Sequence, residues 1–150
     1  MLYFAYGSNL NLDQMAWRCP GAEMVGPATL YGYRLAFRGP LDIQMFSPAS
    51  VPGFVFDVTD PADWEALDAY EGYPHLYNRI KLRVTLGSGR RVRAIVYIMT
   101  PETKARRGEE PPGRGYLSIV REGYKQCGLS GERGVLDDAL EKAMNPRPGC

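Results

Sequence analysis

Residues 77–99, YNRIKLRVTLGSGRRVRAIVYIM, decide the fold class of this chain. Between Tyr77 and Leu86, apolar side chains alternate with charged ones, which is the period-two pattern of a strand with one buried face. Gly87-Ser88-Gly89 then supplies a turn, and Val92–Met99 returns as a second strand. The sequence therefore predicts an antiparallel hairpin, and the other elements are assigned around it.

The chain before this hairpin is expected to be mostly strand. Short apolar runs predict strands at Leu2–Tyr6, Ala28–Phe37 and Val51–Val58. The prolines within Gly39–Ser50 predict a loop between the second and third of these strands.

Helix signals occupy the remaining segments. Asn9 or Asn11 is suited to cap a short helix that ends before Pro20-Gly21. Asp60-Pro61 combines a cap residue with proline at the first helical position and predicts a second helix to about Tyr70. Apolar side chains recur at helical spacing in two later segments, separated from the hairpin by an expected loop at Arg106–Gly115. These predicted terminal helices are Tyr116–Cys127 and Gly131–Met144.

Strands followed by helices, without strict alternation of the two, indicate an α+β fold on a mixed or antiparallel sheet that is closed or strongly curled. The length of 150 residues predicts a single domain over residues 1–150. Residues 145–150, with their Pro-Arg-Pro-Gly run, are expected to form a mobile tail.

Composition excludes several classes of protein. Lys and Arg number 18 and Asp and Glu 17, so the net charge of +1 does not favour a nucleic-acid partner. No apolar stretch approaches the roughly 20 residues of a membrane helix, and the N-terminus does not resemble a secretory signal, so a cytoplasmic protein is expected. Three scattered cysteines (Cys19, Cys127 and Cys150) and one histidine indicate neither a disulfide framework nor a metal site.

The common catalytic motifs are missing from the sequence, among them the P-loop, GxGxxG, HExxH and GxSxG. A nucleophilic triad would depend on His75, which lies in a predicted turn where a surface or packing role is favoured. Arg79 begins a run of six basic residues and no acid that ends at Arg93; a solvated hairpin face is favoured over an anion-binding patch. Whether Arg79 or His75 reaches a pocket is left open.

Two segments carry chemical interest. In Tyr6-Gly7-Ser8-Asn9 a strand ends in glycine before a helix, which exposes consecutive backbone N–H groups suited to carboxylate or phosphate oxygens. Glu71 ends a predicted helix among aromatic side chains, where burial would raise its pKa toward neutrality and suit it to acid–base catalysis. From the residues alone, an ordinary turn and a surface glutamate remain open as alternatives.

Together these segments resemble the gamma-glutamylcyclotransferase-like (AIG2-like) family. Leu2–Leu10 (LYFAYGSNL) is similar to the family's opening motif, and Leu67-Asp68-x-x-Glu71-Gly72 is similar to the segment that carries its catalytic glutamate. Further matches follow in the same order. They are Phe46-Ser47-Pro48, Val51-x-Gly53-x-Val55, Tyr97-x-Met99-Thr100, Pro111-Pro112, Tyr116, Gly123 and Gly128-Leu129. The resemblance extends over about residues 2–145.

The resemblance implies a small mixed barrel with flanking helices and a cofactor-independent enzyme of the lyase or acyltransferase type. The implied reaction is a gamma-glutamyl cyclotransfer. The α-amine of a gamma-glutamyl group attacks its own γ-amide carbonyl, which releases 5-oxoproline and a free amino acid or amine. Glu71 matches the general acid–base residue. The residues implied to bind substrate are Tyr3, Tyr6, Gly7, Ser8, Asn9 and Tyr116. No metal is implied, and the expected partner is a small molecule rather than nucleic acid or membrane.

Two other functions remain open. One is the same chemistry on a dedicated gamma-glutamyl-protected biosynthetic amine. The other is a non-catalytic module that binds a small acid. The leaving group, the pathway and the choice between monomer and homodimer are not determined by the sequence.

Overall fold

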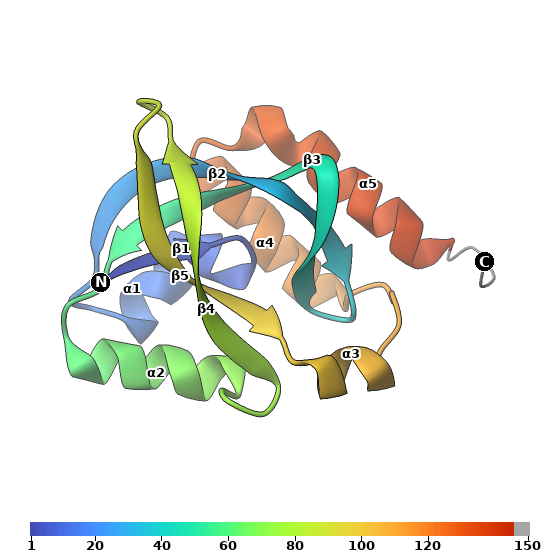
Figure 1. The fold of residues 1–150 in the computed structure, drawn as a ribbon, viewed down its shortest axis with the longest axis horizontal. Helices are drawn as coiled ribbons and strands as arrows, with labels where there is room; N and C mark the ends of the chain where they lie inside the picture. Colours follow the sequence, from blue (N-terminus) through green and yellow to red (C-terminus); the bar gives the residue numbers. More distant parts are fainter. Residues whose placement is uncertain (146–150) are drawn as a thin grey trace.

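The computed structural model describes residues 1–145, in which five strands close into a barrel with helices around it (Figure 1). The strands are β1 (Leu2–Ala5), β2 (Glu23–Phe37), β3 (Leu41–Asp57), β4 (Tyr77–Leu86) and β5 (Arg91–Met99). Their order is β1-β3-β2-β4-β5, and the parallel pairing of β1 with β5 closes an otherwise antiparallel sheet. The predicted α+β fold with a closed mixed barrel is confirmed. Cys150 and positions 146–150 of the expected mobile tail lie outside the described residues.

The hairpin that decided the fold class is present as β4 and β5, paired from Tyr77 with Met99 to Thr85 with Arg91. Val84 and Val96 are buried inside the barrel. Arg83 lies directly opposite Arg93, and both are exposed. The hairpin therefore places its apolar face in the core and its basic face in solvent, as the alternation predicts.

The loop predicted over Gly39–Ser50 is wrong, because β3 runs through most of it. Tyr33 pairs with Met45 and Tyr31 with Ser50, so four residues of β3 bulge outward opposite one residue of β2. Pro48 lies in this bulge, where the missing N–H of proline removes no ladder hydrogen bond. The prolines therefore mark an irregular strand rather than the end of one. The same pairing extends β2 back to Glu23, five residues before its predicted start.

The helices carry the caps that the sequence indicates. Asn11, rather than Asn9, caps α1 (Leu12–Arg18) by accepting from the N–H of Gln14. Asp60 caps α2 (Pro61–Glu71) by accepting from the N–H of Ala62. The short helix α3 (Pro101–Arg106) was not predicted. The remaining elements are η1 (Ser8–Leu10), α4 (Arg114–Gln126), η2 (Ser130–Glu132) and α5 (Arg133–Met144).

The helices cover the barrel from different sides (Figure 1). α2 lies along one edge of the strands, and α5 lies on the other side, against β2. α4 packs on η1, where Gly123 lies against the backbone of Leu10. Cys19 and Cys127 are buried free thiols. No helix in residues 1–145 combines the length and apolar character needed to cross a membrane.

Candidate active site

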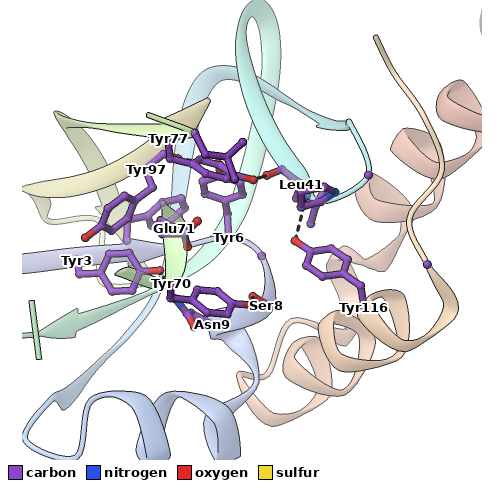
Figure 2. A pocket seen from close by; sticks show the side chains of 16 residues that line it. Tyr3, Tyr6, Ser8, Asn9, Leu41, Tyr70, Glu71, Tyr77, Tyr97 and Tyr116 are labelled. Carbon is purple, nitrogen blue, oxygen red and sulfur yellow. Dashed lines mark hydrogen bonds between the residues drawn. The ribbon is translucent and has the colours of Figure 1, made fainter. Parts of the chain in front are cut away.

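One cavity of about 420 Å³ lies where β1, the end of α2, the start of β4 and the first turn of α4 meet. Figure 2 shows its lining side chains, among them six tyrosines, pointing toward a common space. All seven site residues predicted from the sequence line this cavity: Glu71, Tyr3, Tyr6, Gly7, Ser8, Asn9 and Tyr116. The structure therefore brings together residues from three distant parts of the chain, while their roles stay predictions.

The end of α2 sets the position of Glu71. Gly72 adopts a left-handed conformation with φ of 66°, which glycine reaches without steric cost. The N–H of Gly72 donates to the carbonyl of Ala69, and the N–H of Tyr73 donates to the carbonyl of Asp68. These hydrogen bonds end the helix. Glu71 is consequently the last helical residue, and its side chain lies in the cavity rather than along the helix surface.

Glu71 has the acid–base properties that its place in the sequence suggests. Loss of hydration in the cavity raises the pKa of its carboxyl to about 7, while the positive charge of Arg18 partly opposes this rise. Among residues 1–145, no side chain or backbone group donates a hydrogen bond to this carboxylate. A carboxyl group with a pKa near neutrality and free oxygens can both accept and return a proton at neutral pH.

The loop from Tyr6 to Asn9 forms a second wall. It follows β1 and ends in the short helix η1, which Asn11 closes by donating its N–H to the carbonyl of Ser8. Within the described chain, the N–H groups of Gly7 and Asn9 donate to no protein acceptor. A Cβ on residue 7 would lie 3.1 Å from the hydroxyl oxygen of Tyr116, so glycine allows this close approach. The loop thus leaves backbone donors free beside the cavity.

Hydrogen bonds hold the loop in place from both sides. The Tyr6 hydroxyl donates to the backbone carbonyl of Tyr97 at 2.6 Å. The Ser8 and Tyr70 hydroxyls are 2.7 Å apart, which joins the loop to the last turn of α2. Because these contacts involve buried or half-buried groups, they fix the loop relative to Glu71.

Leu41, at the start of β3, is a site residue that sequence reasoning missed. Its N–H donates to the Tyr116 hydroxyl at 3.0 Å, and its carbonyl accepts from the Tyr77 hydroxyl at 2.7 Å (Figure 2). Both peptide groups of Leu41 are therefore held by tyrosines from other elements. No side-chain pattern signals this role, because Leu41 contributes its backbone.

Tyr97 was also missed as a lining residue, and strand alternation does not signal it, because it pairs with Arg79 on the face of the hairpin that carries the arginines. Tyr97 is buried there beside α2, where its hydroxyl donates to Asp68 at 2.7 Å. Tyr70 and Tyr77 line the cavity as well, in keeping with the aromatic surroundings expected for Glu71. Burial raises the pKa of Tyr77 and Tyr97 far above the ordinary value, so both hydroxyls keep their protons.

Two residues left open by the sequence lie outside the lining. Arg79 forms an ion pair with Asp68 at 3.2 Å and lies over the Tyr73 ring. His75 is exposed in the turn after α2, where its carbonyl accepts from Thr100. In the described chain, no group of three or more His, Cys, Asp or Glu side chains is arranged to hold a metal ion.

Comparison with protein families gives one match over most of the chain. The family model described as "Gamma-glutamyl cyclotransferase, AIG2-like" matches residues 3–117, which include every predicted site residue.

Curated relatives and solved structures agree with this match. A human protein named gamma-glutamylcyclotransferase is 29% identical over 140 residues, covering 85% of this chain and 72% of the relative. The mouse protein of the same name is 28% identical, covering 87% and 73%. A solved structure titled "Gamma-glutamyl cyclotransferase" superposes with a TM-score of 0.78 at 26% identity, covering 99% of this chain and 89% of the other. The likeness therefore extends beyond the motifs to the whole fold.

Proposed function

The chain belongs to the gamma-glutamyl cyclotransferase, AIG2-like family, and from this premise we propose that it cleaves a gamma-glutamyl amide by intramolecular cyclisation. The α-amine of the glutamyl group attacks its own γ-carbonyl carbon, the amide C–N bond breaks, and 5-oxoproline and a free amino acid or amine are released. Nucleophile and electrophile belong to one molecule, so the enzyme has to hold a folded conformer and move protons.

The proton balance defines what the enzyme must do. The substrate begins with an α-ammonium carrying three protons. One proton must leave before the nitrogen can attack, and a second leaves as the lactam forms. The nitrogen of the leaving group takes up these two protons and is released as an ammonium. A single group that accepts and returns protons beside both nitrogens is therefore sufficient.

Glu71 is the residue that we assign to this role, and its environment is the observation that carries the proposal. Its carboxyl has a pKa raised to about 7 by burial. In residues 1–145 its oxygens are not engaged by any protein donor, so they remain free for a substrate ammonium. At neutral pH the ionised and protonated forms are both populated, as proton transfer in both directions requires.

The wall formed by the loop from Tyr6 to Asn9 offers hydrogen-bond donors for the rest of the substrate. The free N–H groups of Gly7 and Asn9 lie beside the cavity, and we assign them to the substrate carboxylate or to the oxyanion that forms on the γ-carbonyl. A preorganised donor to such an oxyanion typically contributes about 3 kcal/mol of transition-state stabilisation. The cavity of about 420 Å³ falls within the range of small-molecule sites.

No step of this reaction transfers electrons or uses water as a reactant, so we propose that it proceeds without a cofactor. Burial raises the pKa of Tyr116 and keeps its hydroxyl neutral, while donation from Leu41 acts in the opposite direction.

The test is release of 5-oxoproline from a panel of gamma-glutamyl compounds: dipeptides, glutathione and gamma-glutamyl-lysine. The wild-type protein and Glu71→Gln are measured side by side, with circular dichroism to verify that both are folded. Turnover by the wild type alone supports the reaction class and the role of Glu71. Turnover by both would remove Glu71 from the mechanism.

Absence of turnover of every compound by folded wild-type protein contradicts activity on these simple substrates. That outcome would favour the alternative function, in which the same chemistry acts on a dedicated gamma-glutamyl-protected amine. Thermal stabilisation by gamma-glutamyl compounds without turnover would instead support a binding module.

A further inference from the structure

Arg18 lies just outside the cavity but is bonded to its wall. It is the last residue of α1, and its guanidinium donates to the side-chain oxygen of Asn9. The guanidinium carbon also lies 3.5 Å from the centre of the Tyr70 ring, over its face. These two contacts hold the cation against two residues that line the cavity. The reaction proposed above gives Arg18 no role.

The contact with Arg18 sets the orientation of the Asn9 amide. A guanidinium can only donate hydrogen bonds, so it must face the amide oxygen rather than the amide nitrogen. The nitrogen then points the other way and donates to the hydroxyl oxygen of Tyr3 at 2.9 Å. Arg18 thus determines that the Tyr3 hydroxyl oxygen accepts a hydrogen bond from the Asn9 amide nitrogen.

An accepted hydrogen bond on the Tyr3 oxygen leaves the tyrosine's own proton to be donated elsewhere. No residue of the described chain accepts it. The ring is held edge-on against Trp64 and Tyr97, with centroids 6.3 and 5.8 Å away, so the hydroxyl cannot swing to another partner. Tyr3 and Glu71 line the same cavity (Figure 2).

We propose that Arg18 is a positioning residue, which acts through Asn9 to turn the hydroxyl proton of Tyr3 into the cavity as a hydrogen-bond donor for anionic oxygen beside Glu71. The use of this donor in catalysis rests on the proposed function, whereas its orientation does not. The chain of contacts runs from the guanidinium to the Asn9 oxygen, and from the Asn9 nitrogen to the Tyr3 oxygen.

The groups around Glu71 agree with this assignment. Tyrosines face it from several elements: Tyr3 on β1, Tyr6 after it, Tyr77 on β4 and Tyr116 on α4. Burial raises the pKa of each of them, so all are neutral near pH 7. Arg18 supplies the positive charge that lowers the pKa of Glu71 against the effect of burial.

The test measures the Glu71 carboxyl directly, so it does not depend on finding a substrate. The side-chain carboxyl carbon is followed by ¹³C NMR across a pH titration and is assigned by its loss in Glu71→Gln. The variants are Arg18→Met, which keeps the stem and cannot donate, Tyr3→Phe, and the double variant. Arg93→Gln on the exposed hairpin face is the control.

Arg18→Met and Tyr3→Phe are each expected to raise the pKa of Glu71, because a Tyr3 hydroxyl dipole turned into the cavity favours the ionised carboxylate without a direct hydrogen bond. The double variant is expected to raise the pKa by clearly less than the two shifts combined. Such coupling is expected if Arg18 acts through Tyr3, because either change breaks the same chain. Additive shifts would overturn the proposal and leave only a direct charge effect of Arg18. Arg18→Lys, which can still donate to Asn9, is expected to restore most of the wild-type titration.

Where the wild type turns over a gamma-glutamyl substrate, Arg18→Met should lower kcat about ten-fold with KM little changed, since one lost hydrogen bond is worth about this factor. Tyr3→Phe should lower kcat by no larger a factor than Arg18→Met does. An unchanged kcat would overturn the proposal while leaving the reaction class intact. Failure of the wild type to act on any compound would speak against the proposed function, and the NMR titration would still decide the orientation of Tyr3.

Discussion

Gly123 of α4 lies so close to Leu10 that a Cβ on residue 123 would be 2.5 Å from the carbonyl carbon of Leu10. Backbone atoms at this distance cannot give way as a flexible side chain can. Leu10 ends η1, the short helix that carries Ser8 and Asn9 into the cavity. The contact therefore links the packing of α4 to the position of the cavity wall that Ser8 and Asn9 form.

Gly123→Ala is expected to destabilise the protein by about 1–3 kcal/mol, because the added methyl group overpacks the interface between α4 and η1. Urea denaturation measures the change in the free energy of unfolding. Gly134→Ala in α5 is the matched control, since a Cβ there meets no atom within 4 Å. Alanine is the better helix former, so this control should leave stability unchanged or raise it slightly. A neutral Gly123→Ala would show that α4 is free to shift away from η1.

Glu71→Gln is expected to stabilise the folded protein at alkaline pH. The folded-state pKa of about 7 lies above the ordinary value of 4.5, so the folded state binds more protons between these two pH values. Stability of the wild type therefore falls as pH rises through this window, and the penalty is complete above pH 7. The neutral Gln avoids it, with an expected gain of about 1–3 kcal/mol at pH 8 and none near pH 4.

Thermal or urea unfolding at pH 4, 6 and 8 measures this difference. Glu65→Gln, on an exposed position of the same helix, is the control for the loss of a glutamate from α2. A constant difference between wild type and Glu71→Gln at all three pH values would mean that Glu71 ionises in the folded protein as it does in water.

The activity proposed for the protein should rise with pH through about 7, because Glu71 must be ionised to take a proton from the substrate ammonium. Below this pH, kcat/KM is expected to fall about ten-fold per unit. The substrate amine also titrates, so the variant Glu71→Asp separates the two causes. If Glu71 causes the fall of kcat/KM at low pH, the pH at which this fall occurs should shift in the variant. If the substrate amine causes the fall, that pH should not change.

The parts of the fold that follow local rules were predictable from the sequence. The alternation in β4 and β5 gave their pairing, and the Asp60-Pro61 pair gave the start of α2. Glu71 was placed correctly at the end of that helix because Gly72 follows it. These features depend on neighbours within a few residues, which the sequence displays directly.

Features that depend on distant partners were not predictable. Pro48 indicates a loop locally, yet β2 pairs with the segments on both sides of it and absorbs it as a bulge. Leu41 contributes to the cavity through its backbone, because its N–H donates to the Tyr116 hydroxyl and its carbonyl accepts from the Tyr77 hydroxyl. Its side chain gives no sign of this role. The orientation of Asn9 depends on Arg18, whose contact becomes apparent only when α1 is placed beside the loop.

Tyr116→Phe tests the wall formed by Leu41. The change removes the hydroxyl that accepts from the Leu41 N–H at 3.0 Å and that lies against Gly7. An N–H left without an acceptor in a half-buried site costs about 1–2 kcal/mol, so the variant should be destabilised by about this amount. Because Tyr77 still holds the Leu41 carbonyl, the strand should remain attached and the fold should persist.

The same variant should raise KM more than it lowers kcat, since Tyr116 shapes the cavity without exchanging protons with the substrate in the proposed reaction. Tyr31→Phe is the control, because Tyr31 is 66% exposed on β2 and lies outside the cavity lining. Steady-state kinetics and urea denaturation on both variants provide the comparison. A Tyr116→Phe protein with normal KM and a large loss of kcat would instead make the Tyr116 hydroxyl part of the proton path, and Glu71 would then no longer be sufficient for it.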